Sequence, residues 1–166
     1  MTDISRQQYS IDLWFTGKPE PVTFLVSDET LGRFQGDFQN DRNSYFVCDT
    51  ITDTCVAINL RHVVMAHLSE IACQVPPKAP ESNAWLEVYL LNHFPGIINI
   101  DDLECLGRIF VQLESAVTVP QEVIPINMGP YRALMIDPAA VMYLKAPSGA
   151  VKEGKKILYR NEQSGR

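Results

Sequence analysis

Apolar positions along the chain fall in short alternating runs that predict β-strands. Residues 10–16 alternate apolar and polar side chains and include two aromatics, which is typical of a strand. A glycine- and proline-rich turn at 17–21 separates this run from a second one at 22–26. After an ambiguous stretch, three further apolar runs predict strands at 44–49, 55–59 and 63–68.

The closing pair of strands is present twice in the sequence. Residues 55–68 and 133–144 each contain an apolar run that ends in Ile-Asn or Ile-Asp. Three turn residues follow, and a second apolar run then begins at Val63 or Val141. This pattern predicts a β-hairpin in each half of the chain. Together with the preceding strand, we expect each hairpin to form a three-stranded meander.

The two halves can be aligned over most of their length. An offset of 75 places 31–33 (Leu-Gly-Arg) on 106–108 (Leu-Gly-Arg) and Val22 on Ile97. Three residues are then inserted, and an offset of 78 aligns the remaining strands. Since the shared feature is the apolar pattern, we interpret it as a tandem duplication.

Residues 28–40 are ambiguous between strand and helix. Taken alone, Phe34 and Phe38 flank Gly36 with strand-like alternation. The apolar positions that both halves share are spaced i, i+3, i+7, which is one face of a helix. Ser27-Asp28 and Asp101-Asp102 stand where helix N-caps and first-turn acids belong. We therefore predict a short helix in each half.

These elements predict a mainly β protein with short helices, built from two tandem, pseudo-symmetric small domains. Each would be a bent sheet or open barrel with the order β-β-short α-β-β-β. We place a first β repeat at 1–73, a proline-rich connector at 74–83, a second β repeat at 84–145 and a basic, flexible tail at 146–166. Because about 65 residues make only a marginal core, we expect the two domains to pack together.

Two short patterns resemble small Sm-like and SH3-like β-barrel domains of uncharacterised bacterial proteins. One is 33–40 followed by Tyr-Phe-Val at 45–47, and the other is the closing Ile-Asn/Asp-x-x-x-Val pattern. The resemblance implies a small barrel-like shape and oligomerisation. RNA-binding Sm domains carry an Arg-Gly pair near the last hairpin. Here the turns are 59–62 and 137–140, and only the first is partly suitable.

Composition and charge narrow the classes of partner. A hydrophobic content of 46% indicates a globular chain, and the net charge of −6 disfavours nucleic acid as a partner. No apolar run approaches the ~18 residues that a membrane span needs. The first residues lack a signal-peptide pattern, so we expect a cytoplasmic protein whose four cysteines are reduced.

Cys48 and Cys55 flank a predicted turn and would lie opposite each other, close enough for a disulfide or half of a metal site. A zinc site needs two more ligands, and nearby His62 and Cys73 form no second pair of the usual spacing. The second half has apolar residues at the two matching positions. We therefore favour packing, and keep metal or redox chemistry as the alternative.

No constellation for catalysis is evident. On a strand, His62 and His67 would point to opposite faces, and His93 lies in a turn. No nucleophile elbow, phosphate loop or dinucleotide fingerprint occurs, and no cofactor is expected. Because Arg61 and His62 have no counterpart in the second half, they are the candidate binding residues. The large aromatics of the first strands are expected in the core: Trp14, Phe15, Trp85 and Tyr89.

The preferred hypothesis is thus a non-catalytic binding or assembly module, with self-association or a protein partner expected. Two alternatives stay open. One is an Sm-like RNA-binding protein, and the other is a small metal protein or enzyme that uses Cys48 and Cys55.

Overall fold

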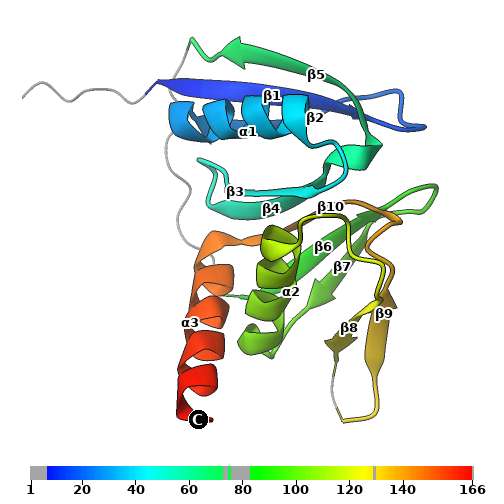
Figure 1. The fold of residues 1–166 in the computed structure, drawn as a ribbon, viewed down its shortest axis with the longest axis vertical. Helices are drawn as coiled ribbons and strands as arrows, with labels where there is room; N and C mark the ends of the chain where they lie inside the picture. The colour runs from blue at the N-terminus through cyan, green and yellow to red at the C-terminus, as the bar shows by residue number, and fades with distance from the viewer. Residues whose placement is uncertain (1–6, 73–74, 76–82, 129, 166) are drawn as a thin grey trace, which may run out of the picture.

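A computed structural model describes residues 7–72, 75, 83–128 and 130–165. Ten strands and three α-helices follow one another as shown in Figure 1. The elements are β1 (Gln8–Phe15), β2 (Val22–Ser27), α1 (Asp28–Asn40), β3 (Tyr45–Asp49), β4 (Thr54–Asn59), the 3-10 turn η1 (Leu60–His62), β5 (Val63–Glu70), β6 (Trp85–Leu90), β7 (Gly96–Asn99), α2 (Leu103–Ser115), β8 (Ile124–Asn127), β9 (Ala133–Ile136), β10 (Val141–Pro147) and α3 (Ser148–Ser164).

The strands form three antiparallel sheets. Their orders are β2-β1-β5, β3-β4-β10-β6-β7 and β8-β9. The predicted mainly β fold with short helices is confirmed, and both halves have the predicted order β-β-α-β-β-β. None of the three sheets closes on itself, so the described residues form no closed barrel.

Both predicted short helices are present, and each begins at a side-chain cap. Ser27 Oγ accepts a hydrogen bond from the Thr30 amide at 3.3 Å, and Asp102 Oδ1 accepts one from the Cys105 amide at 3.1 Å. These bonds satisfy amides that have no partner within the helix. Shared spacing between the two halves therefore identified a helix that the alternation around Phe34 alone would have missed.

The predicted closing hairpins and meanders are wrong. Among the described residues, β4 pairs with β3 and β10, whereas β5 pairs only with β1, so consecutive strands lie in different sheets. Between them, η1 turns the chain: Asn59 Oδ1 accepts from the Arg61 amide at 3.2 Å, and Leu60 is fully buried. The apolar pattern located both strands correctly, but the partner of each strand is decided by long-range contacts.

The predicted flexible tail is also wrong. Residues 146–147 finish β10, and the next 17 residues form α3, which packs along α2. Its apolar face buries Val151 and Leu158. At Gly107 of α2 and Gly154 of α3 the backbones are so close that a Cβ on Gly107 would lie 2.3 Å from a Gly154 backbone atom. The exposed basic residues Lys152, Lys156 and Arg160 lie on the solvent face of this amphipathic helix.

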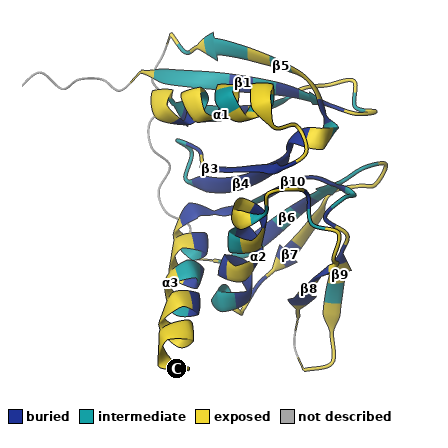
Figure 2. Ribbon diagram, viewed as in Figure 1, coloured by how far each residue is buried: buried dark blue, intermediate teal, exposed yellow. Residues whose placement is uncertain are grey.

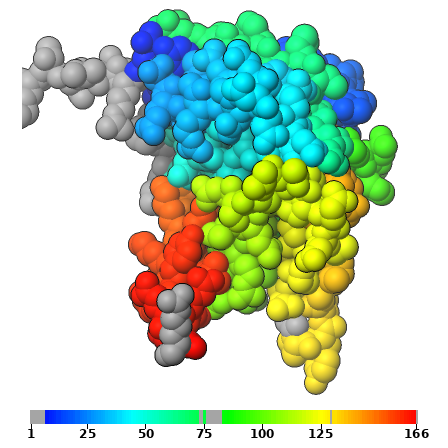
Figure 3. Space-filling model, viewed as in Figure 1, coloured from blue at the N-terminus to red at the C-terminus, as the bar shows by residue number. Residues whose placement is uncertain are grey.

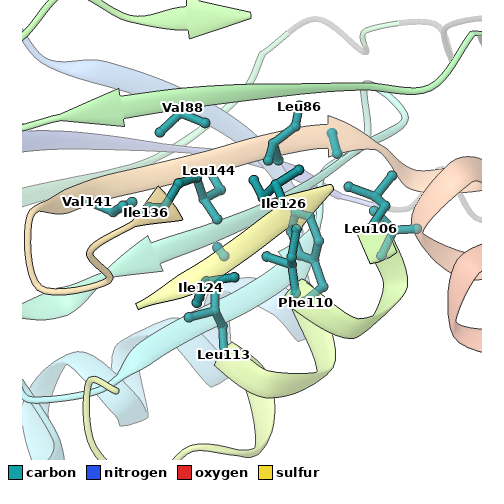
Figure 4. Close-up of a cluster of buried hydrophobic side chains, with 14 of the residues drawn as sticks. Leu86, Val88, Leu106, Phe110, Leu113, Ile124, Ile126, Ile136, Val141 and Leu144 are labelled. Carbon is teal, nitrogen blue, oxygen red and sulfur yellow. The ribbon is translucent and has the colours of Figure 1, made fainter. Parts of the chain in front are cut away.

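Two hydrophobic cores share one wall. Alternate residues of β3 and β4 face opposite ways: Phe46 and Ile58 enter the core beneath α1, while Val47 and Ala57 enter the core beneath α2. Dark blue in Figure 2 marks this wall and the inner faces of α2 and α3. Figure 4 shows the second core, where side chains of α2, β6, β8, β9 and β10 converge.

The first and last strands of each half pair in the same register. In β1 and β5, Trp14 lies opposite Met65; in β6 and β10, Tyr89 lies opposite Tyr143. Trp14 corresponds to Tyr89 at the offset of 75, and Met65 corresponds to Tyr143 at the offset of 78. Each ladder is also interrupted by an irregularity at this point.

The ladder of β3 and β4 likewise has the same register as that of β8 and β9. Phe46 lies opposite Ile58, and Ile124, at an offset of 78, lies opposite Ile136.

One part of the alignment needs correction. In the sheets, Leu13 is opposite Val22, whereas the matching Val88 is opposite Gly96 and not Ile97. The offset is therefore 74 along the second strand of each half. With this offset, the buried Phe24 corresponds to the buried Ile98. The apolar pattern alone had aligned the second strands one residue further along the chain.

Candidate functional site

Arg61 and His62 lie in η1, at the junction between the two halves. The Arg61 guanidinium donates to Asn43 Oδ1, with Nε at 2.9 Å. His62 Nε2 donates to the Ala139 carbonyl oxygen in the second half at 2.6 Å. The two side chains therefore have different partners within the chain, and the His62 bond joins the halves.

Two residues that the sequence pattern did not single out, Asn59 and Tyr45, strengthen this junction. The Asn59 side chain is fully buried, and its Nδ2 donates to the carbonyl oxygens of Pro138 at 3.3 Å and Val141 at 3.0 Å. Tyr45 Oη donates to the same Pro138 oxygen at 2.6 Å. Burial raises the pKa of Tyr45 well above its usual range, so it remains a donor at neutral pH. A buried asparagine at the end of an apolar strand was the available signal.

The predicted opposition of Cys48 and Cys55 is wrong. Cys48 is opposite Val56, and Cys55 is opposite Asp49. Because their side chains point to opposite faces of the sheet, Cys48 lies in the first core and Cys55 in the second. Both are free thiols.

The environment of these thiols is apolar. Burial raises the pKa of Cys48 to about 12 and raises that of Cys55 further above its usual range. Such thiols are inert, and packing, the favoured interpretation, explains both positions. Across the described residues, no three His, Cys, Asp or Glu side chains are grouped to hold a metal ion. Cys73 lies outside the described residues.

The remaining histidines do not converge with His62. His67 lies on the outer face of β5, where its Nδ1 is 3.2 Å from Asp12 Oδ2. A hydrogen bond from Thr23 Oγ1, at 2.6 Å, lowers the pKa of Asp12, and His67 lowers it further. His93 is exposed in the turn between β6 and β7. The pair of Asp12 and His67 corresponds in position to Glu87 and Lys145, 3.8 Å apart.

The aromatics of the first strands divide between core and cleft. Phe15 is buried and stacks on Tyr143, which in turn stacks on Tyr89 with ring centroids 4.0 Å apart. These three rings form one wall of an open cleft of about 260 Å³ between the halves. Trp14 and Trp85 are half-buried. Besides the phenols of the half-buried Tyr89 and the buried Tyr143, the titratable groups that line the cleft are Lys18, Glu20 and His93.

The antiparallel ladder of β4 and β10 is the main joint between the halves. Five residue pairs are in register, from Tyr143 opposite Ile58 to Pro147 opposite Thr54. On each face the joint buries apolar side chains, among them Met142 and Ala57. This joint makes β3, β4, β10, β6 and β7 one continuous sheet that contains strands from both halves.

The strands that correspond to these two by position, β9 and β5, are each paired along only one edge within the described chain. Val64 and Met65 of β5 have relative exposures of 62% and 50%, and Met135 of β9 has 62%. In Figure 3, β8 and β9 project from the body of the molecule at the lower right. Edge strands with exposed apolar side chains are templates for pairing with another chain.

None of the helices in the described residues has the length and apolar content needed to cross a membrane. Comparison with known proteins found no matching family model, no matching curated protein and no matching solved structure.

Proposed function

We propose that this chain is a non-catalytic assembly module that binds further protein by strand pairing along the free edges of its sheets. The observation that carries the proposal is the joint of β4 and β10: a sheet that continues from one half to the other through in-register pairing. The two strands that correspond to them keep unpaired edges bearing apolar side chains. Strand addition of this kind uses main-chain hydrogen bonds for affinity.

We also propose that the two halves are copies of one ancestral unit. The equal registers of β1 with β5 and β6 with β10 support this origin, since a shared alternation of apolar residues does not require shared registers. A duplicated unit that joins to its own copy through strand edges has the means to join to further copies.

The candidate side chains are engaged within the chain, so the proposed assembly uses strand edges and not these groups. Arg61 and His62 donate to partners within the chain, and the buried thiols of Cys48 and Cys55 face separate cores. RNA binding remains an alternative prediction without a specific observation in its favour. A gel shift with oligouridine at low salt, weakening as salt rises, would support it.

Sedimentation velocity of the full chain over a wide range of concentration tests the assembly proposal. We expect the weight-average mass to rise with concentration toward dimers and larger species. A strict monomer at every concentration would overturn self-assembly as the function of the free edges.

A further inference from the structure

We propose that β5 of one chain pairs antiparallel with β9 of a second copy, in the same register as β4 pairs with β10 inside the chain. This inference rests on the proposed function and names its partner: another molecule of the same protein. Under the offset of 78, β5 corresponds to β10 and β9 to β4. The joint between β5 and β9 is therefore a pairing that the strand pattern implies and that the described part of a single chain does not form.

The register follows from the internal joint. Tyr143 is opposite Ile58 and Ala146 is opposite Cys55. Subtracting 78 from the β10 residues and adding it to the β4 residues places Met65 opposite Ile136 of the second copy. The pairs that follow along the two strands are Ala66 with Met135, His67 with Leu134, and Leu68 with Ala133.

The exposed apolar residues lie where this joint would bury them. Val64 and Met65, exposed on β5, correspond to Met142 and Tyr143, which are 4% and 5% exposed. Their side chains would enter the second core of the neighbouring copy, as Met142 and Tyr143 enter the first core of their own chain.

On β9, the other strand of the proposed joint, an exposed residue likewise corresponds to a buried residue of the internal joint. Met135, exposed on β9, corresponds to Ala57, which is fully buried at the internal joint. The inward-facing residues of β9, Leu134 and Ile136, already belong to the second core, as Val56 and Ile58 of β4 belong to the first. Only the outward face and the hydrogen-bonding edge of β9 lack a partner in the described chain.

The polar groups at the joint are complementary. At the internal joint, the Asn59 amide donates to the Val141 carbonyl oxygen. On β5, the corresponding Val63 oxygen already accepts from the Arg42 guanidinium. The residue that corresponds to Asn59 is Asp137, an exposed carboxylate. In the proposed register this carboxylate approaches Arg42 of the other copy, so an acceptor meets a charged donor.

The arrangement is head-to-tail. β5 and β9 lie at opposite ends of the molecule in Figure 1, so one chain does not pair them with each other. Each copy therefore presents one β5 edge and one β9 edge, a heterologous interface. Repetition gives a ring if the rotation closes and a filament if it does not.

Two charge variants test the joint through complementation. Met65→Lys damages the β5 edge and leaves β9 intact, while Met135→Lys does the reverse. Each variant alone should associate roughly a hundredfold more weakly than wild type, because a buried lysine charge lacks a partner. An equimolar mixture should recover one joint and sediment as a dimer. Ile97→Lys, at an exposed apolar position on the free edge of β7, is the matched control and should associate like wild type.

The register is tested by cysteine pairs on separate chains in a Cys73→Ser background. Leu68→Cys mixed with Ala133→Cys, and His67→Cys mixed with Leu134→Cys, should form disulfides under mild oxidation. In an antiparallel ladder, the distance between the Cα atoms of opposite residues alternates between long and short from one pair to the next. One of the two mixtures therefore has the shorter distance between its cysteines. Leu68→Cys mixed with Met135→Cys is the diagonal control and should cross-link at least about tenfold more slowly.

The outcomes separate the inference from the proposed function. A wild-type chain that stays monomeric overturns both. A wild-type chain that associates while Met65→Lys or Met135→Lys associates equally well overturns this joint alone. Dimers of Met135→Lys by itself, with monomeric Met65→Lys, would indicate pairing of β5 with β5 and would likewise overturn it. Circular dichroism of Met65→Lys and Met135→Lys, expected to match wild type because both positions are exposed, verifies folding.

Discussion

The two helices α1 and α2 occupy corresponding places in the two halves, but they have different surroundings. α2 lies between the second core and α3, and its buried residues include Gly107. α1 buries Phe34 and Thr30, and most of its outer face is exposed (Figure 2). Gly32 corresponds to Gly107, yet a Cβ there would meet no atom within 4 Å. The same sequence element can thus be a tight contact in one half and an open surface in the other.

The largest effect should come from filling the contact between α2 and α3. Gly107→Ala places a Cβ against the Gly154 backbone, which cannot move without separating the helices, so we expect a loss of about 3 kcal/mol of unfolding free energy. The matched change, Gly32→Ala, should instead stabilise by up to about 1 kcal/mol, because alanine favours a helix and meets open space. Urea denaturation followed by circular dichroism measures both. Equal effects at the two glycines would contradict the contrast.

A second comparison concerns Asn59 and Asp137, which cap corresponding turns. Asn59→Ala should cost about 2 kcal/mol, because the Val141 oxygen at the buried joint loses the Asn59 donor and the Pro138 oxygen keeps only Tyr45 Oη. Asp137→Ala should cost only about 0.5 kcal/mol in the monomer, since its carboxylate is exposed and accepts only from the Ala139 amide at 2.9 Å. Chemical denaturation at low protein concentration, where association is absent, is the measurement. A larger loss at Asp137 would contradict the assignment of the joint.

A third comparison concerns Cys48 in the first core and Cys55 in the second core. Both thiols have raised pKa values in the folded protein, so the neutral form is favoured by folding. Their contribution to stability is complete below about pH 9, the value for an unfolded cysteine, and is lost as pH rises toward the folded pKa of about 12 for Cys48. The unfolding free energy should therefore fall above pH 9, and Cys48→Ala or Cys55→Ala should each flatten that slope.

Labelling followed by peptide mass spectrometry gives an independent measurement for the thiols. At pH 8, both cysteines should react with iodoacetamide far more slowly in the folded protein than in urea, because thiolate is scarce and access is blocked. Rapid labelling of either residue in the folded chain would argue against its position in the core. Binding of zinc in elemental analysis, lost in Cys48→Ala, would contradict the separation of the two side chains.

The smallest effect should come from the charge pairs on the outer faces of β5 and β10. His67→Ala should cost at most about 0.5 kcal/mol, because the His67 side chain of the pair with Asp12 is largely exposed. The lowered pKa of Asp12 means that its contribution is present above the unfolded value and is lost as pH falls through the folded value. The effect should accordingly be present above about pH 4, the value for an unfolded aspartate, and should fade below it. Lys145→Ala at the corresponding pair is the control for comparison by urea denaturation at those pH values.

Residue patterns located nearly every element of this fold. The alternation of apolar residues marked the strands, and the spacing shared by Leu31, Phe34 and Phe38 with the second half identified the helices. Ser27 and Asp102 were recognisable as caps. These features depend on neighbours within a few residues, so the sequence carries them directly.

The residue pattern predicted less of the candidate site than of the fold. Arg61 and His62 were singled out because the second half lacks them, and His62 does lie at the junction. Its partner, the Ala139 carbonyl oxygen, and the buried amide of Asn59 could not be foreseen, because they depend on which strands pair across the halves. The prediction for Cys48 and Cys55 failed for a related reason, since one step of register changes the face on which each side chain lies.

By itself, the sequence determined a mainly β chain of two halves with the same order of elements, because local apolar periodicity and helix caps suffice for that. Only the tertiary structure decided that β4 leaves its neighbour β5 to pair with β10, and that the basic end of the chain becomes a helix against α2. Those choices depend on main-chain edges and apolar faces that meet only when distant segments pack. The same physics leaves β5 and β9 with edges that one chain does not satisfy.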